Sequence, residues 1–489
     1  MTHQFRNAFL GLILSGICLS GCNQEAKKDR IDEENTSEVR DTHPVTIVFL
    51  ESNKSTHAEL KSTLAKKFQS LDLGTPNFES RSVSEFVADP IPGDLVLYPP
   101  NAFGDLFQKE LLRPIPSYVV DSTPYRLSDV LRNQRRMFGI HQKTYYATSL
   151  GVSSYMLLCH RNLLDANGLS VPQTWAEYEN VCQQLATLKK NKQLKSISNL
   201  GRFSPAIEPL KENWKAVSLL ARTASSIRTS GRYSVCFDYS TWNPLVNSPP
   251  FAKALTQQKN SFQLMHTEHR DLDPREVERA FLNHECVLAI TWPHPPSVEE
   301  KESAKKTEGA EAYLLPGSNK KYNYSENTWN EALFSESRIQ FLGASGLCCS
   351  ILKSSLQSGV ATRRLALISG KELSGLIGKE NPQTGFPYRA SHLTKAHDWI
   401  SPKYSAHFSE LFCTIVEQQN QAKVWMCRPR YQKSAEYESI LAVEIRQFLN
   451  GNSTALQSLS KVSKKWKQLG ESLDLEFQKQ VNLETLGAK

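Results

Sequence analysis

Residues 145–188 read YYATSLGVSSYMLLCHRNLLDANGLSVPQTWAEYENVCQQLATL, and this stretch decides the fold. It predicts a buried strand over 154–159 and then a short helix that ends at Gly168. Thr174 is expected to cap a second helix, whose inward face carries Trp175, Tyr178, Cys182 and Leu185. A strand followed by helices in this order is typical of an α/β protein.

Strands and helices are also expected to alternate in the part of the chain before this stretch. The segments VTIVFLES (45–52) and GDLVLYPP (93–100) predict buried strands of a parallel sheet. A helix is expected over 57–70 between them, and a second helix, opened by Asn101, follows the later strand. We therefore expect the N-terminal part of the chain to form an α/β lobe.

Further segments follow the order of one known family's motifs. They are DLVLYPPNAFGDLFQKELLRPI (94–115), LLCHRNLLDANGL (157–169), VPQTWAEY (171–178), VNSPPFAKAL (246–255), REVERAFLNHECVLAITWP (275–293), GASGLCCSILKSS (343–355) and GFPYRAS (385–391). Over residues 45–450 the chain thereby resembles the extracellular solute-binding proteins of family 1, the sugar-type receptors of ABC importers. It departs from the family pattern at Cys159–His160, where Tyr-Asn is usual, at Asn283 and His284, where small residues are usual, and in the long polar stretch 304–340.

The resemblance implies a fold like that of the type II periplasmic binding proteins, with two α/β lobes, a hinge and a cleft between the lobes. It places lobe 1 at 44–153 and 341–388, and lobe 2 at 154–340 and 389–489. The first crossing between lobes would lie near 151–155. Closure of the lobes around a solute is a hinge motion, and the importer would recognise the closed form.

The N-terminus has the layout of an export signal. Arg6 is followed by an apolar run over 9–17 that is too short to span a bilayer, and then by small residues. Leu19–Cys22 (LSGC) resembles the lipobox of bacterial lipoproteins, which predicts a signal peptide over 1–21 and a lipidated Cys22. The charged segment 22–43 is expected to be a disordered tether. The alternative is an ordinary secretory signal followed by a chance cysteine.

Composition and motifs exclude several other classes of protein. The formal net charge of +8 is spread among interleaved acidic residues, which argues against nucleic-acid binding. Gly343–Leu347 lacks the last glycine of a nucleophile elbow, Gly375–Lys379 is too short for a phosphate loop, and His392 and His397 do not share a helix face. We expect no catalytic residue, no metal ligand and no cofactor. Eight cysteines remain after Cys22, and we expect mostly structural thiols, with a vicinal Cys348–Cys349 disulfide as the alternative.

The candidate ligand residues fall into three groups. Ligands bind beyond the carboxyl ends of parallel strands, which favours residues that directly follow such strands. Sugars also need aromatic faces beside polar side chains, and a turn at a lobe crossing offers hydroxyl and N–H groups. The candidates are Glu51, Asn53, Asn101, Ser149, Trp242, Trp292, Ser345 and Arg389, of which Trp292 is the expected stacking platform. The alternatives are core packing for the tryptophans, helix capping or solvent exposure for Glu51, Asn53 and Asn101, a simple bend for Ser345, and an ion pair that locks the hinge for Arg389.

Together these observations predict a lipid-anchored receptor of the bacterial periplasm, in the inner or the outer membrane. It would be a monomer that captures a small solute, expected to be a carbohydrate, and delivers it to ABC permease subunits without catalysing a reaction. The alternative is a sensor or scaffold lipoprotein that uses the same fold with a degenerate cleft and transports nothing.

Overall fold

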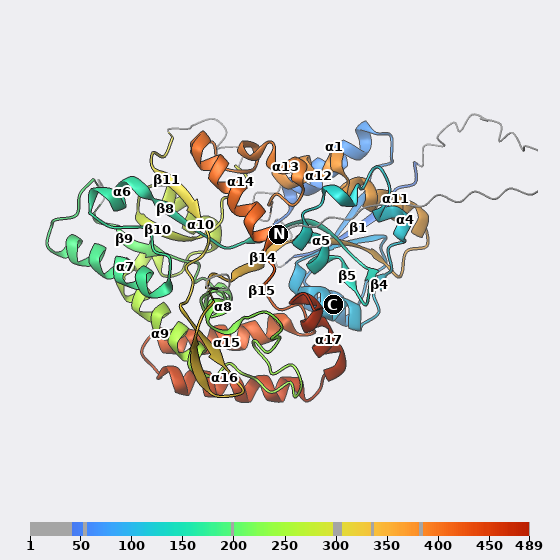
Figure 1. Ribbon diagram of the computed structural model, residues 1–489. Coiled ribbons are helices and arrows are strands. Elements are labelled where there is room, and N and C mark those ends of the chain that lie inside the picture. The colour runs from blue at the N-terminus through green and yellow to red at the C-terminus, as the bar shows by residue number, and fades with distance from the viewer. Residues whose placement is uncertain are drawn as a thin grey trace, which may run out of the picture. The chain divides into compact units, whose positions relative to one another are not determined.

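The computed structural model describes residues 42–51, 56–196, 200–296, 306–333, 337–380 and 385–488 (Figure 1). All of them belong to one unit of the chain, Asp41–Lys489. The predicted signal peptide, Cys22, nearly all of the predicted tether and Asn53 lie outside the described residues. The expectations for them therefore stay predictions.

A seven-stranded sheet contains both strands predicted near the N-terminus. Its path is β15 (Trp425–Cys427), β14 (Gln340–Leu352), β3 (Leu95–Tyr98), β1 (Thr46–Leu50) and β2 (Asn77–Arg81), and β4 (Leu112–Arg113) and β7 (Thr148–Ser154) pair with β14. Strand β1 runs parallel to β2 and β3, which confirms the predicted parallel pair. The sequence analysis missed β2, because its residues NFESR are polar and partly exposed on an edge strand.

A second, four-stranded sheet has the order β11 (Ala310–Tyr313), β8 (Met156–His160), β10 (Cys286–Thr291) and β9 (Ser204–Ile207). Strand β10 is parallel to β9 and antiparallel to β8. Only Tyr155 separates β7 of the first sheet from β8 of the second, and Tyr155 lies inside the range expected for the first crossing. Figure 1 shows β8–β11 on one side of the long strand β14 and β1 on the other.

Helices cover both sheets. They are α1 (Ala58–Ser70), α2 (Val83–Ala88), α3 (Phe103–Gln108), α4 (Ser117–Val120), α5 (Arg132–Phe138), α6 (Arg161–Ala166), α7 (Trp175–Lys190), α8 (Trp214–Ile227), α9 (Pro249–Leu264), α10 (Pro274–Leu282), α11 (Ser358–Ser369), α12 (Lys371–Lys379), α13 (Ala390–Leu393), α14 (Ala406–Gln421), α15 (Ser434–Leu449), α16 (Ala455–Gly470) and α17 (Leu475–Thr485). Short 3₁₀ helices lie at Pro100–Ala102, Leu127–Asp129, Thr267–His269 and Ala396–Trp399, and two hairpins pair β5 (Ile140–His141) with β6 (Thr144–Tyr145) and β12 (Lys320–Asn323) with β13 (Thr328–Glu331). Within the described ranges, no helix has the length and apolar character needed to cross a membrane.

The predicted division into lobes is followed only in part by the sheets. Strand β14 begins at Gln340, next to the predicted return to lobe 1 at residue 341. Strand β15, however, lies in the range 389–489 predicted for lobe 2, and it pairs with β14 in the first sheet. The lobe boundaries therefore remain a proposal.

Local signals in the decisive stretch act as predicted. The Thr174 side chain accepts a hydrogen bond from the Glu177 N–H at the start of α7, and the predicted inward face of α7 is buried. The helix expected to open at Asn101 is different in the structure. Asn101 lies inside the 3₁₀ turn Pro100–Ala102, and α3 begins only at Phe103 without a side-chain cap.

All eight cysteines of the described residues are free thiols. Cys348 and Cys349 are fully buried in β14, where neighbouring side chains of a strand point to opposite faces of the sheet. Burial raises the pKa of the Cys348 thiol to about 12. The structure therefore contains the packed thiols expected from the sequence and no vicinal disulfide between Cys348 and Cys349.

Two departures from the family pattern lie in contact with each other. His160 ends β8, and its buried ring lies between the ring of Phe281 at 4.0 Å and that of His284 at 4.3 Å between centroids. Its Nε2 is 2.8 Å from the Phe281 carbonyl oxygen, which fixes Nε2 as the protonated nitrogen. The unusual residues at 160 and 284 thus form one stacked unit between the end of β8 and the turn that follows α10.

This stack predicts a loss of stability in mild acid. Burial lowers the pKa of His160 from its ordinary value of 6.5 to about 3. Below pH 6.5 the unfolded chain gains a proton that the native state does not, so the stability present above pH 6.5 falls as the pH falls towards 3, by about 2 kcal/mol at pH 5. Denaturant titrations at pH 7 and pH 5 should show this loss in the wild type and in the control His397→Asn, whose ring is largely exposed. The loss should be smaller by about 2 kcal/mol in His160→Asn, which keeps the contribution of His392, whose pKa burial also lowers to about 3. An equal loss in that variant contradicts the assignment.

Candidate functional site

A cavity of about 230 Å³ lies where the sequence predicts a ligand, beyond the carboxyl ends of β1, β2 and β3. Its lining residues are Leu50, Glu51, Thr56, His57, Ser82, Val83, Pro99, Ser345, Gly346 and Leu347. The cavity brings together Glu51 and Ser345, which are almost 300 residues apart in the sequence. Its volume is below the roughly 300 Å³ at which pockets for drug-sized ligands begin, so it suits a small molecule.

The Glu51 carboxylate is held by neighbours at the cavity wall. It lies 2.5 Å from Lys61 Nζ, accepts a hydrogen bond from Ser80 Oγ at 2.7 Å, and accepts one from the His57 N–H at 3.2 Å. Its side chain is almost wholly buried, while Lys61 is partly exposed. A carboxylate has about four acceptor positions, and these three contacts with described residues leave one for a further donor, such as a ligand hydroxyl.

Ser345 and Gly346 form an irregular part of β14 opposite Glu51. The register of β14 against β7 shifts on both sides of this pair, as in a β-bulge. The Ser345 N–H donates to Ser153 Oγ at 3.1 Å, and Ser153 Oγ donates to the Ser345 carbonyl at 3.3 Å. Gly346 has φ +133°, and a Cβ there would lie 2.3 Å from the Gly151 carbonyl oxygen, so only glycine fits. The bulge therefore places Ser345 at the cavity.

An aromatic cluster lies at the end of β10. Trp292 directly follows this strand, and its ring is 5.5 Å from Tyr155, 5.9 Å from Trp214 and 5.1 Å from His294 between centroids. Trp292 is 1% exposed, and its Nε1–H has no acceptor among the described residues. A buried indole N–H usually has a partner, so an acceptor is missing at this position.

Arg428 connects the aromatic cluster to the bulge. Its guanidinium lies 5.6 Å from the Trp214 ring, forms a two-point ion pair with Glu438 at 2.7 Å, and donates from Nη1 to the Ala344 carbonyl at 2.9 Å. The Glu438 carboxylate and the Tyr155 hydroxyl raise the pKa of Arg428 against the effect of burial, so it stays charged. Sequence analysis missed Trp214 and Arg428, because neither directly follows a strand that the sequence predicted.

Ser149 and Arg389 make most of their polar contacts elsewhere, although Arg389 Nε has no hydrogen-bond partner among the described residues. Ser149 Oγ donates to Gln134 Oε1 at 3.0 Å and accepts from the Gly151 N–H at 3.2 Å. Arg389 is fully buried, lies 3.4 Å from Asp129 and donates to the Ser369 carbonyl. Neither residue lines the cavity at Glu51. Arg389 thus makes an ion pair, which was the alternative to ligand binding.

Asn101 and Trp242 are also apart from this cavity. Asn101 is buried in its 3₁₀ turn. Trp242 is 5% exposed and stacks on Phe237, with 4.5 Å between ring centroids. The polar loop around Trp242 lines a different and larger cavity. Their assignment as ligand residues stays a prediction.

The described residues offer no group of three His, Cys, Asp or Glu side chains that could hold a metal ion. The cavity offers hydrogen-bonding groups, among them the Glu51 carboxylate, Ser345 and backbone groups. Groups of this kind can bind a small polar molecule with hydroxyls. The Trp214–Trp292 pair and Arg428 are not among its lining residues and form a separate buried cluster near the β14 bulge.

Comparison with known proteins supports the fold. No family model and no curated protein matches the chain. Among solved structures, an ABC transporter solute-binding protein from Agrobacterium radiobacter in complex with ribitol has a TM-score of 0.65 at 16% identity, covering 88% of this chain and 99% of that one. A solute-binding protein from Agrobacterium vitis with bound D-mannitol has a TM-score of 0.62 at 14% identity (88% and 98% covered), and the maltose-bound MalE3 of T. maritima has 0.60 at 14% (87% and 99% covered). The predicted fold class, an α/β protein of the type II periplasmic-binding-protein kind, is confirmed.

Proposed function

We propose that this protein is the solute receptor of an ABC importer and that it captures a small carbohydrate or sugar alcohol. The observation that carries the proposal is the cavity beyond the carboxyl ends of β1, β2 and β3, where Glu51 faces the bulge at Ser345. The fold-level neighbours with bound ribitol and D-mannitol support a solute of this size. The protein catalyses nothing itself; it passes the solute to permease subunits when the lobes close.

We also propose that the receptor works as a monomer outside the cytoplasm and is held at a membrane through a lipid on Cys22. This rests on the signal-like apolar run and the LSGC motif. A lipid anchor keeps the receptor close to its permease. Mass spectrometry of the protein isolated from membranes should find diacylglycerol on an N-terminal Cys22; a mature chain that begins elsewhere contradicts this part of the proposal.

Ligand screening by thermal unfolding tests the receptor function. The purified protein is mixed with pentitols, hexitols, monosaccharides and disaccharides, with amino acids, polyamines and phosphate as controls. A true ligand at 100 times its dissociation constant should stabilise the native state by about 2.7 kcal/mol and raise the melting temperature. If none of the saccharides or polyols stabilises the protein, the proposal is contradicted and the sensor or scaffold alternative is favoured.

A charge-neutral variant tests the cavity itself. Glu51→Gln keeps the shape of the side chain but replaces a charged acceptor by a neutral one, and hydrogen bonds to charged groups are stronger by about 1 kcal/mol. We expect the affinity for the ligand found in the screen to fall by about fivefold in calorimetry. Glu110→Gln, which changes an exposed carboxylate paired with Lys353, is the matched control and should bind as the wild type does. Equal affinity in Glu51→Gln would remove Glu51 from the site.

A further inference from the structure

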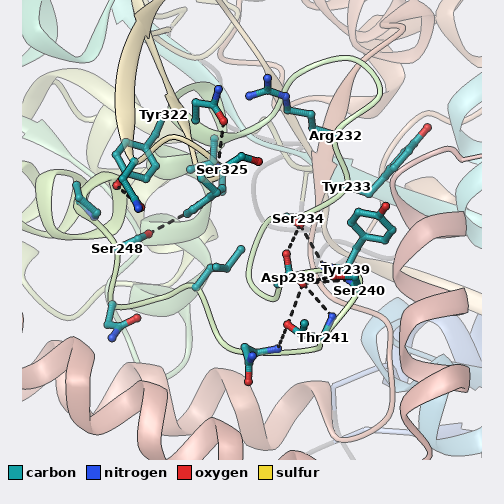
Figure 2. Close-up of a pocket in the computed structure, with 18 of the residues that line it drawn as sticks. Arg232, Tyr233, Ser234, Asp238, Tyr239, Ser240, Thr241, Ser248, Tyr322 and Ser325 are labelled. Carbon is teal, nitrogen blue, oxygen red and sulfur yellow. Dashed lines mark hydrogen bonds between the residues drawn. The ribbon is translucent and has the colours of Figure 1, made fainter.

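A second and larger cavity of about 850 Å³ lies between the loop 231–249 and the β12–β13 hairpin (Figure 2). Its lining residues come only from 227–249 and 322–327, so it shares none with the cavity at Glu51. A volume of this size lies within the range of sites for organic ligands, roughly 300–1,000 Å³.

The loop side of this cavity is rigid. Both Asp238 oxygens are used within the loop: Oδ1 accepts from the backbone N–H and hydroxyl groups of Ser240 and Thr241, and Oδ2 accepts from Ser234 Oγ at 3.2 Å. These hydrogen bonds lower the pKa of Asp238 to about 2 against the effect of burial. Beneath the loop, the stacked Phe237 and Trp242 rings pack on Trp466 of α16 and Tyr437 of α15. A preformed wall spares a ligand the entropic cost of ordering it.

Hydrogen bonds also hold the side of the cavity that the β12–β13 hairpin forms. Tyr322 donates its hydroxyl hydrogen to Asn327 Oδ1 at 3.3 Å, and Asn323 Oδ1 accepts from the Ser325 N–H at 3.1 Å. The Tyr324 hydroxyl lies 3.3 Å from Ser248 Oγ, which joins the hairpin to the start of α9. Figure 2 shows Tyr322 and Ser325 on one side of the cavity and Tyr233 and Tyr239 on the other.

The chemistry of the lining is that of sugar recognition. Tyrosines provide aromatic faces, and Tyr239 is 49% exposed although its ring is large. Asn243, Asn247 and Asn323 provide planar amides, which both donate and accept hydrogen bonds as sugar hydroxyls do. Among the described lining residues, the charged side chains are Asp238 and Arg232. Both Asp238 oxygens already accept hydrogen bonds within the loop, so little free negative charge remains for a cationic ligand, and the Arg232 guanidinium can donate to ligand hydroxyls.

We propose that this cavity is a second carbohydrate site, which binds an oligosaccharide of about three units between the 231–249 loop and the β12–β13 hairpin. It is several times larger than the cavity at Glu51 and is built from different residues, so the two sites take ligands of different length. A receptor with such a site holds a longer saccharide on its surface in addition to the small solute of its cleft. The inference does not depend on transport by the Glu51 site.

Calorimetry with a defined set of trisaccharides tests the second site. The probes are linear trimers of glucose, galactose, mannose and N-acetylglucosamine, added to the wild type and to Tyr239→Ala, Tyr239→Phe and Tyr118→Ala. We expect at least one trimer to bind the wild type, Tyr239→Ala to lose about tenfold or more in affinity, and Tyr239→Phe to keep it within about threefold, because the aromatic face remains. Tyr118→Ala removes a tyrosine of similar exposure in α4, outside the cavity, and should bind as the wild type does.

Two results would overturn the proposal. One is the absence of binding by every trimer. The other is equal affinity for the trimer in the wild type and in Tyr239→Ala, together with a loss of trimer binding in Glu51→Gln. In that case the trimer would occupy the cavity at Glu51. Since Tyr239 is half exposed, its variants should keep the melting temperature of the wild type, so a loss of affinity reports on binding and not on folding. If small sugars fail to bind at Glu51, the test of trimer binding at the second cavity is unaffected.

Discussion

Replacing Arg222 by Met is expected to lower the free energy of unfolding by about 3–5 kcal/mol. Arg222 and Glu208 are both 1% exposed in their side chains, and they form a two-point ion pair with distances of 2.8 and 3.2 Å. The guanidinium also lies 4.5 Å from the Trp175 ring and 5.2 Å from the Tyr178 ring. Removing one partner leaves the Glu208 charge buried and unpaired, which is far more costly than losing an exposed pair.

The measurement is a denaturant titration of matched variants. Arg161→Met removes an exposed pair with Asp165 and should leave the unfolding midpoint unchanged. The double variant Arg222→Met/Glu208→Met removes both charges and should recover most of the loss, because apolar side chains of similar size can replace a buried ion pair. A single variant as stable as the wild type, or a double variant no better than the single one, would show that the cost does not come from the unpaired carboxylate.

Trp292→Ala is the second variant with a large expected effect. The indole is buried against Tyr155, Trp214 and His294, so its removal leaves a cavity at the junction of the sheets and should cost about 3–5 kcal/mol of stability. In the folded fraction we expect ligand binding to weaken by about 1–3 kcal/mol through lost aromatic contact. Denaturant titration measures the first effect and calorimetry with the ligand from the screen measures the second.

Trp292→Phe separates these two effects. Phenylalanine keeps an aromatic ring in place and removes the Nε1–H, which has no acceptor among the described residues, so the stability should fall far less than in Trp292→Ala. If a bound solute supplies the missing acceptor, affinity falls in this variant as well. Unchanged affinity in both folded variants would remove Trp292 from the site and leave it a core residue.

Much of the fold was predictable because its signals are local. The apolar runs at 45–52 and 154–159 and the cap at Thr174 act over a few residues, and they produce β1, β8 and α7 nearly as expected. β2 could not be predicted in this way, because a polar edge strand becomes a strand only by pairing with β1. The Asn101 turn was mispredicted for a related reason: consecutive prolines at 99 and 100 shape the backbone there more than an Asn cap does.

The site was predictable only in its position on the sheet. The rule for parallel strands places Glu51 at the edge where a cavity lies, and Ser345, which precedes Gly346, lies there too. Trp242 was a candidate because it is an aromatic residue in a polar stretch, and such a pattern does not show which side chains turn inward. Trp242 stacks on Phe237 beneath the loop, while Tyr239, three residues earlier, is half exposed.

The sequence by itself determined the α/β class, the strand–helix order and the candidate export signal, because these depend on neighbours along the chain. Tertiary structure alone decided which polar groups remain available for a ligand. Arg389 pairs with Asp129, Ser149 donates to Gln134, and Asp238 accepts hydrogen bonds within its own loop, whereas Ser345 lies at a cavity. The physical reason is that a buried polar group needs a hydrogen-bond partner, and the packing of distant segments determines whether that partner is the protein or a ligand.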